Sequence, residues 1–184
     1  DVTVDADVKT LNVNSSTTAS TLTDLIAAGA TTVNVSGDAA LTLTNNTFTA
    51  ATAINVTNIA GVTFGTTAIG VNTTFTGGAG KDIINGYYTD QSESSVEYDT
   101  VSYSYLTSKA VAIDLTAGTA VVDSNDSDTL ISIENAIGGS LGDIITGSTD
   151  INSLEGGAGN DTFISSLGND FIYGGNVTSG LHTD

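Results

Sequence analysis

The chain has 184 residues and a formal net charge of −18, because 21 acidic residues are set against only three lysines and no arginine. A phosphate backbone would be repelled by such a surface, so we expect no nucleic-acid binding. No stretch approaches the roughly 20 apolar residues that a membrane span needs, so we expect none. The chain has no cysteine. Disulfides are therefore excluded, and structural metal is an alternative means of stabilising the fold.

Residues 1–76 alternate apolar and polar residues in short bursts rich in Thr, Asn and Val. Equivalent apolar residues in four bursts are spaced 22, 21 and 21 apart, namely Leu11, Val33, Ile54 and Phe75. A second series has the same period and matches Leu41 with Val62 and Leu43 with Phe64. Alternation predicts half-buried strands, and recurrence near 21 residues predicts stacked coils of a parallel β-solenoid. An antiparallel β-sandwich is the alternative.

One segment of this region departs from the pattern. Residues 20–30 place Leu22, Leu25 and Ile26 at helical spacing and have Gly29 near their end. Capping threonines and a closing glycine are typical of helix ends. We therefore expect a short helix near residues 21–29.

Residues 138–175 can be written as rows of nine: GGSLGDIIT, GSTDINSLE, GGAGNDTFI and SSLGNDFIY, with GG opening a fifth. Position six is acidic or amide in every row, and position eight is apolar in every row. The position-six residues are Asp143, Asn152, Asp161 and Asp170, and the position-eight residues are Ile145, Leu154, Phe163 and Ile172. An earlier row, 77–85 (GGAGKDIIN), has the same form. So strict a period indicates a repeat architecture.

The rows GGAGNDTFI and GGAGKDIIN fit GGxGxDxUx, and the set resembles the calcium-binding nonapeptide repeat of RTX proteins. The resemblance implies a β-roll in which two rows make one turn and several calcium ions lie between turns, 18 residues apart. It pairs Asp143 with Asp161, and Asn152 with Asp170. The ligand residues that it implies are Gly77, Gly78, Gly80, Asp82, Gly139, Asp143, Asn152, Gly156, Gly157, Gly159, Asp161, Gly168 and Asp170.

The residue types suit calcium, a hard cation that takes six to eight oxygen ligands. Carboxylates alone would repel one another in that number, so backbone carbonyls must contribute from tight turns. Glycine permits such turns and lets the backbone approach an ion closely. A flexible Gly/Asp-rich loop is the alternative, although four rows in register with an apolar position eight argue against it.

Residues 86–137 connect the first nonapeptide row to the others. Residues 86–95 are polar and predict a loop. Alternating apolar residues then predict strands, and these residues are Val101, Tyr103 and Tyr105, followed by Val111, Ile113 and Leu115. The runs YDTVSYSY, AIDLTAG and LISIENAIGG are similar to the calcium-binding C-terminal domain of serralysin-type secreted metalloproteases. That resemblance adds Asp99, Ser132 and Glu134 as calcium ligands.

Two local clusters in this segment allow two interpretations each. Asp123, Asp126 and Asp128 have spacing that resembles part of a calcium loop, but the cluster lacks the glycine and glutamate of an EF-hand; a solvated turn is the alternative. Tyrosines are also frequent here, and they form either a sugar-contact patch or packing on the roll: Tyr87, Tyr88, Tyr98, Tyr103 and Tyr105.

We therefore expect an all-β chain, a parallel β-solenoid or β-roll with calcium between its turns. Its parts are solenoid repeats over 1–76, the roll over 77–175 and a tail over 176–184. We expect no enzyme, because the zinc-protease motif HExxH is absent and the single histidine is His182, close to the end of the chain.

Low lysine, absent cysteine and abundant Thr, Ala, Asn and Gly resemble secreted RTX-type surface-layer (S-layer) proteins. The resemblance implies a calcium-dependent structural module that is exported by type I secretion and self-associates at the extracellular cell surface. One alternative is an RTX adhesin fragment that binds glycan or a host surface. Another is the non-catalytic calcium domain of a secreted hydrolase or epimerase.

Overall fold

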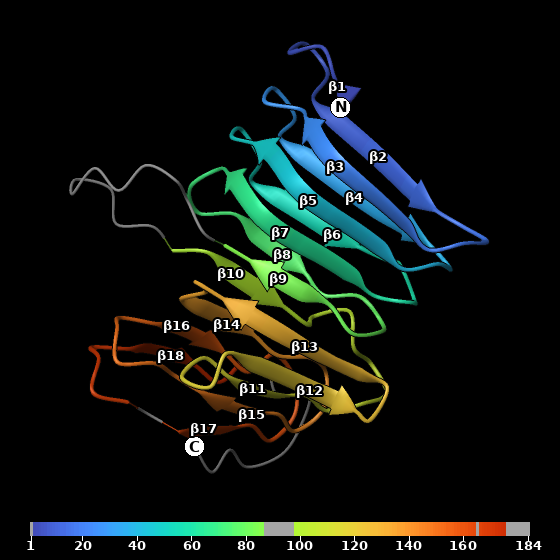
Figure 1. The fold of residues 1–184 in the computed structure, drawn as a ribbon. Helices are drawn as coiled ribbons and strands as arrows, with labels where there is room; N and C mark the ends of the chain where they lie inside the picture. The colour runs from blue at the N-terminus through green and yellow to red at the C-terminus, as the bar shows by residue number, and fades with distance from the viewer. Residues whose placement is uncertain (1, 87–97, 165, 176–184) are drawn as a thin grey trace.

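The computed structural model describes residues 2–86, 98–164 and 166–175, and it folds them into a parallel β-solenoid of about seven turns. The chain passes back and forth between two facing sheets, so that each turn adds one strand to each sheet (Figure 1). In the described part of the chain there is no helix long and apolar enough to cross a membrane.

The two sheets contain ten and eight strands. The first sheet consists of β1 (Val2–Thr3), β3 (Ser20–Ile26), β5 (Leu41–Phe48), β7 (Val62–Ile69), β9 (Ile83–Asn85), β13 (Asp126–Ile131), β12 (Thr119–Asp123), β11 (Ala112–Asp114), β15 (Ile144–Thr146) and β17 (Thr162–Ile164), in that spatial order. The second sheet consists of β18 (Phe171–Tyr173), β16 (Ser153–Glu155), β14 (Asn135–Ile137), β10 (Thr100–Ser102), β8 (Thr74–Thr76), β6 (Ala53–Val56), β4 (Thr32–Gly37) and β2 (Thr10–Ser15).

The strand register confirms the predicted repeats. In the second sheet Leu11 pairs with Val33, Val33 with Ile54, and Ile54 with Phe75. In the first sheet Leu41 pairs with Val62, and Leu43 with Phe64. The nonapeptide rows continue both ladders at a spacing of 18, because Ile145 pairs with Phe163 and Leu154 with Ile172.

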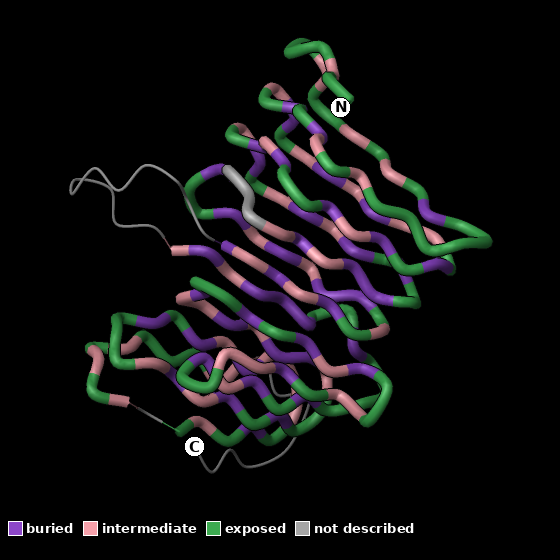
Figure 2. The backbone as a smooth tube through the Cα atoms, in the orientation of Figure 1, coloured by how far each residue is buried: buried purple, intermediate pink, exposed green. Residues whose placement is uncertain are grey.

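The core is a continuous column of these inward residues between the sheets. Burial alternates along the strands, as parallel sheets with one covered face require (Figure 2). Phe64 and Phe75 are both buried and meet edge to face across the two sheets, with ring centroids 5.9 Å apart. Both sheets also continue across the expected boundary between residues 76 and 77, since β7 pairs with β9 and β8 with β10.

An antiparallel excursion interrupts the regular winding between β10 and β14. There β12 pairs antiparallel with both β11 and β13, while β13 pairs in parallel with β9 and β11 in parallel with β15. The first sheet therefore gains two strands that the second sheet lacks. The inward positions of β11 follow the predicted alternation, because Val111, Ile113 and Leu115 are all buried.

The predicted helix near residues 21–29 is wrong, because residues 20–26 form strand β3. The helical spacing has a different cause. In the neighbouring β5, Leu43 and Asn46 are buried while the two residues between them are exposed. Leu22 and Leu25 pair with Leu43 and Asn46. The ladder between β3 and β5 keeps its register, but the alternation of buried and exposed residues is interrupted at the same point in both strands. Residues three apart therefore share one face of a strand, which imitates a helix.

Candidate metal centre

The position-six residues, together with Asp99, stand at the two corners of the solenoid, each directly before a strand. Asp82, Asp143 and Asp161 precede β9, β15 and β17 of the first sheet, whereas Asp99, Asn152 and Asp170 precede β10, β16 and β18 of the second. Most are buried despite their polarity, namely Asp82, Asp99, Asp143, Asn152 and Asp161. Each corner therefore carries a ladder of side-chain oxygens that runs along the solenoid.

The first-sheet ladder links consecutive turns through backbone amides. The Asp143 N–H donates to Asp161 Oδ1 at 2.9 Å, across 18 residues. The carboxylate of Asp143 itself accepts from the amides of Val111 and Gly139, at 2.8 and 2.6 Å. The structure thus brings together the pair that the RTX resemblance implies.

The Asp82 turn repeats this geometry one level earlier. The Asp82 carboxylate accepts from the Val62 amide at 2.6 Å and from the Gly78 amide at 3.3 Å. The Asp82 N–H donates to Asp128 Oδ1 at 2.9 Å. Asp128 therefore accepts a hydrogen bond from the Asp82 amide in the same way that Asp161 accepts one from the Asp143 amide.

The second-sheet ladder includes the residues added by the serralysin resemblance. The Asp99 N–H donates to Glu134 Oε2 at 2.9 Å, and Asp99 Oδ1 accepts from the Thr73 amide at 2.6 Å. The Asn152 N–H donates to Asp170 Oδ1 at 3.1 Å. Both predicted pairs, Asn152 with Asp170 and Asp143 with Asp161, are thus in contact.

Ser132 differs from the other expected ligands. It follows β13, its side chain is exposed, and its φ of 51° lies in the left-handed region. Its carbonyl lies so close to Gly86 that a Cβ there would be 2.2 Å away. Ser132 therefore contributes a backbone oxygen to the corner rather than a hydroxyl.

The glycines of the rows allow the turns to stack closely. Gly157 has a φ of 92°, and a Cβ there would lie 2.2 Å from the Gly139 carbonyl. At Gly156 a Cβ would lie 2.2 Å from Asp161 Oδ2. The other expected glycines lie in equivalent turns: Gly77, Gly78, Gly80, Gly159 and Gly168. Carbonyls and carboxylates consequently approach one another at each corner.

Burial makes these carboxylates reluctant to ionise without a cation. Burial raises the pKa of Asp82 to about 6 and the pKa of Asp128 to about 7, and neighbouring acids add to both increases. Burial also raises the pKa of Asp143, and Asp161 contributes repulsion. Stacked carboxylates of this kind need protons or a cation to be held together.

Asp128 belongs in sequence to the acidic cluster with Asp123 and Asp126, for which a calcium loop and a solvated turn were both open. A local signal identifies its role: an acidic residue two places before an inward apolar residue. Asp128 precedes the buried Leu130 by two, as Asp82 precedes Ile84. The period does not reveal it, because 46 residues separate Asp82 from Asp128.

The oxygen donors fit calcium. Within residues 2–86, 98–164 and 166–175, no group of three or more acidic or histidine side chains is arranged to hold a metal ion. Paired carboxylates must therefore be completed by carbonyls of the glycine turns, and an all-oxygen set of this kind suits a hard cation. The residues that would hold calcium are Asp82 with Asp128, Asp143 with Asp161, Asp99 with Glu134, and Asn152 with Asp170, each with turn carbonyls.

Comparison with known proteins supports this assignment. Residues 71–88 and 137–172 match the RTX calcium-binding nonapeptide repeat, in four copies. No curated protein matches the chain. The repeat match covers the turns that carry Asp82, Asp143, Asn152, Asp161 and Asp170, and the fold is the parallel solenoid that such repeats require. The chain therefore contains an RTX-type calcium-binding β-roll.

Proposed function

We propose that this chain is a calcium-dependent structural module of an extracellular surface layer, with no catalytic role. The observation that carries the proposal is the pair of carboxylate ladders, which connect turn to turn along both corners of the roll. Proteins with these repeats are typically extracellular or secreted. Calcium is abundant outside cells, and export by type I secretion is part of the proposal.

The chain's own residues explain why folding would follow calcium. Asp82 and Asp128 are buried, adjacent and mutually repulsive when both are ionised. Without a cation they favour a looser roll at neutral pH, which suits passage through a secretion channel. Bound calcium supplies the positive charge that lets them remain ionised in the folded corner. The glycine turns then stack closely, and the inward ladder of the strands is completed.

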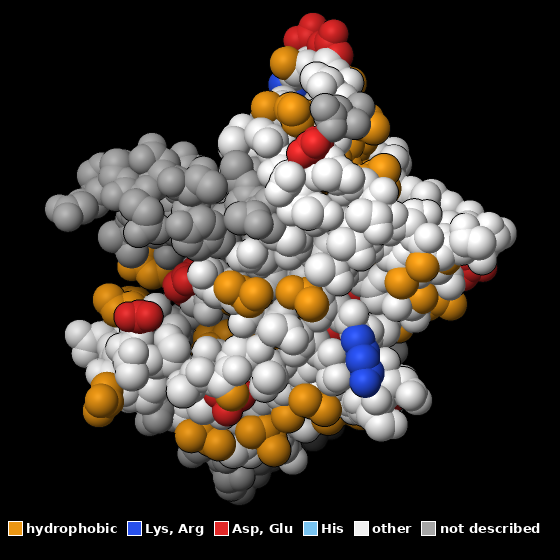
Figure 3. Space-filling view, viewed as in Figure 1, with side chains coloured by type: hydrophobic (Ala, Val, Ile, Leu, Met, Phe, Trp, Pro, Cys, Tyr) orange, Lys and Arg blue, Asp and Glu red, His pale blue; other side chains and the backbone are white. Residues whose placement is uncertain are grey.

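A lattice requires faces that tolerate contact between chains of net charge −18. The outer face of the first sheet offers one. Val121 pairs with Ala112, and Ala112 pairs with Ile144, so three exposed apolar side chains lie side by side on β12, β11 and β15. Apolar side chains gather over this part of the molecule, with a few charged side chains beside them (Figure 3). Such a face supports self-association because its exposed apolar side chains can be buried against a neighbouring copy.

Assembly with and without calcium tests this proposal. Light scattering and negative-stain microscopy should show ordered sheets above a threshold calcium concentration and their loss on chelation. Ile144→Asp should prevent assembly while leaving the calcium-induced circular dichroism change intact. Thr23→Asp, at an exposed position of β3, is the matched control and should still assemble. A chain that folds with calcium but stays monomeric at every concentration would overturn the structural role.

A groove of about 330 Å³ favours a second candidate, an adhesin that binds glycan. It is lined by Tyr98, Ile151 and Phe171 together with Asn135, Asn152 and Ser153. Aromatic faces beside amides and a hydroxyl are suited to sugar rings. Of the predicted tyrosine patch, Tyr103 is buried in the roll and Tyr87 and Tyr88 lie outside the described residues. Phe171→Ala should lower binding on a glycan array if this candidate is right.

A further inference from the structure

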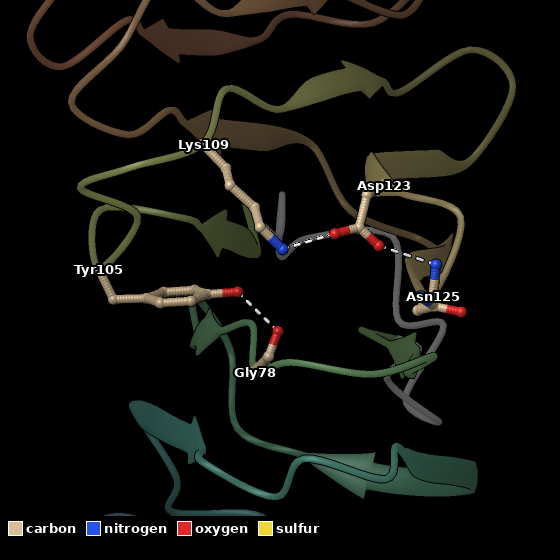
Figure 4. A network of polar contacts seen from close by, with 5 residues as sticks. All are labelled: Gly78, Tyr105, Lys109, Asp123 and Asn125. Atoms are coloured by element: carbon tan, nitrogen blue, oxygen red, sulfur yellow. Dashed lines mark hydrogen bonds and ion pairs between the residues drawn. The ribbon is translucent and has the colours of Figure 1, made fainter.

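The three aspartates before and within β13 do not act as one cluster. Asp123 faces outward and forms an ion pair with Lys109, at 2.5 Å between Nζ and Oδ2 (Figure 4). Its Oδ1 accepts from the Asn125 amide at 2.8 Å. Asp126 and Asp128 are both buried, on the face of β13 that also buries Leu130. The hairpin thus separates one solvated carboxylate from two inward ones.

The two inward carboxylates meet the first nonapeptide turn. Asp128 accepts from the Asp82 amide, and its Oδ2 accepts from the Tyr103 hydroxyl at 2.5 Å. The neighbouring Tyr105 hydroxyl donates to the Gly78 carbonyl at 2.6 Å (Figure 4). Oxygens from three segments, the 77–82 turn, the 103–105 segment and the hairpin, are therefore gathered at one place.

Asp126 is buried beside these groups, and one of its carboxylate oxygens has no hydrogen-bond partner among the described residues. It is 7% exposed, and in the part of the chain that the structure describes its buried Oδ1 accepts no hydrogen bond. Its charge is the largest charge effect on the pKa of Tyr105, and it also raises the pKa of Asp82 and of Asp128. Asp126 and Asp128 lie two residues apart on one buried face of β13, so the Asp126 side chain lies beside Asp128, which the Asp82 amide and the Tyr103 hydroxyl contact.

The charges around Asp126 do not neutralise it. Asp123 repels it, and Lys109 attracts it but is exposed and paired with Asp123. A buried carboxylate oxygen without a partner destabilises the fold, because it has lost its hydrogen bonds to water. A bound cation would remove that destabilisation.

We propose that Asp126 and the carbonyl of Gly78 form a further divalent-cation site that shares Asp128 with the Asp82–Asp128 pair and fastens the β12–β13 hairpin to the first nonapeptide turn. The donors are all oxygens, which selects calcium over softer metals. The site uses two carboxylates with neutral oxygens, and the hairpin residues lie outside the segments that match the nonapeptide repeat. It does not depend on assembly into a surface layer.

The test compares Asp126→Asn with Asp123→Asn, a control in the same hairpin whose carboxylate is exposed. Bound calcium is counted by equilibrium dialysis of the full chain, and terbium is used as a luminescent probe excited through tyrosine. Asp126→Asn should bind one calcium ion fewer and lose part of the terbium emission, because Tyr103 and Tyr105 lie beside the site. Asp123→Asn should match the wild type in both measurements.

The melting temperature provides a second readout, measured in chelator and in calcium. In chelator, Asp126→Asn should melt at the same temperature as the wild type or higher, because a buried charge is gone. In calcium, its gain in melting temperature should be smaller than that of the wild type. An unchanged ion count with an unchanged calcium response would overturn this site alone, whereas a wild type that binds no calcium would overturn the calcium roll itself.

Discussion

At the scale of single residues, the main feature of this fold is that several acidic side chains are buried. Asp82, Asp128 and Asp143 are buried, and each accepts backbone or hydroxyl hydrogen bonds that partly offset the loss of water. These bonds lower the pKa of each carboxyl, but burial raises it by more. The corners are therefore stable with protons or with cations, and least stable when ionised and empty.

A pH dependence follows for the chain in chelator. The pKa of Asp82 is raised from 3.8 to about 6, and that of Asp128 to about 7. The folded state thus binds more protons than the unfolded state between pH 4 and 7, so stability is full below about pH 4 and falls as pH rises to about 7. The loss should be on the order of 3 kcal/mol for Asp82 alone.

Urea unfolding between pH 4 and 8 measures this, with saturating calcium as the matched condition. Calcium competes with protons for the same oxygens, so it should stabilise the chain most above pH 7 and remove the decline. A calcium-free chain whose free energy of unfolding rises steadily from pH 4 to 7 would contradict the account of these carboxylates.

The nine-residue period was sufficient to place Asp143, Asn152, Asp161 and Asp170 at one position of the turn, directly before a strand. It was insufficient for Asp128 and Asp126. Asp82, which contacts Asp128, is 46 residues away from it, and the intervening hairpin has no period. The sequence of residues 123–128 (DSNDSD) does not indicate which side chains point inward, because that depends on the register with which β13 pairs with β9.

At the scale of elements, short strands are held by the ladder rather than by their own propensity. The strands of the nonapeptide rows are three residues long, and each contributes one inward residue, such as Ile145 or Leu154. The earlier coils use strands of up to eight residues but keep the same column of apolar side chains. The apolar spacing in the sequence predicted this column correctly, because strand register is set by the buried face.

The expected helix near residues 21–29 is instead strand β3, so apolar spacing alone was not sufficient there. Leu22 and Leu25 share a face in β3 because the alternation along this strand is interrupted between them, as it is in β5. Spacing alone does not separate that case from a helix. This segment is a strand because it pairs with β5 of the next coil, and a local sequence pattern does not contain that pairing.

Removing a large residue from the column should destabilise the whole stack. Phe75 is fully buried and packs edge to face on Phe64. Phe75→Ala should lower the free energy of unfolding by about 3–5 kcal/mol, in calcium, by urea titration. The control Thr74→Ala lies on the same strand with its side chain toward the other face, and its effect should stay within about 0.5 kcal/mol. Equal effects of the two variants would contradict the assigned inward face.

At the scale of the whole molecule, the solenoid is a one-dimensional stack in which each turn depends on its neighbours. Among the described residues, the last turn shows this directly. Phe171 of β18 is 72% exposed, and Ile172 is half exposed although its ladder partner Leu154 is fully buried. Stability therefore depends on whatever joins consecutive turns, and in the roll those joints are the carboxylate corners.

The most direct test of the central claim is a calcium titration of the full chain, followed by far-ultraviolet circular dichroism and reversed with a chelator. We predict a rise in strand signal that saturates with calcium, returns on chelation and is weakened in the variant Asp161→Asn, since that residue bridges two turns. An unchanged spectrum and an unchanged melting temperature from chelator to saturating calcium would contradict the claim. The aspartate ladders would then stabilise the fold through hydrogen bonds and protons alone.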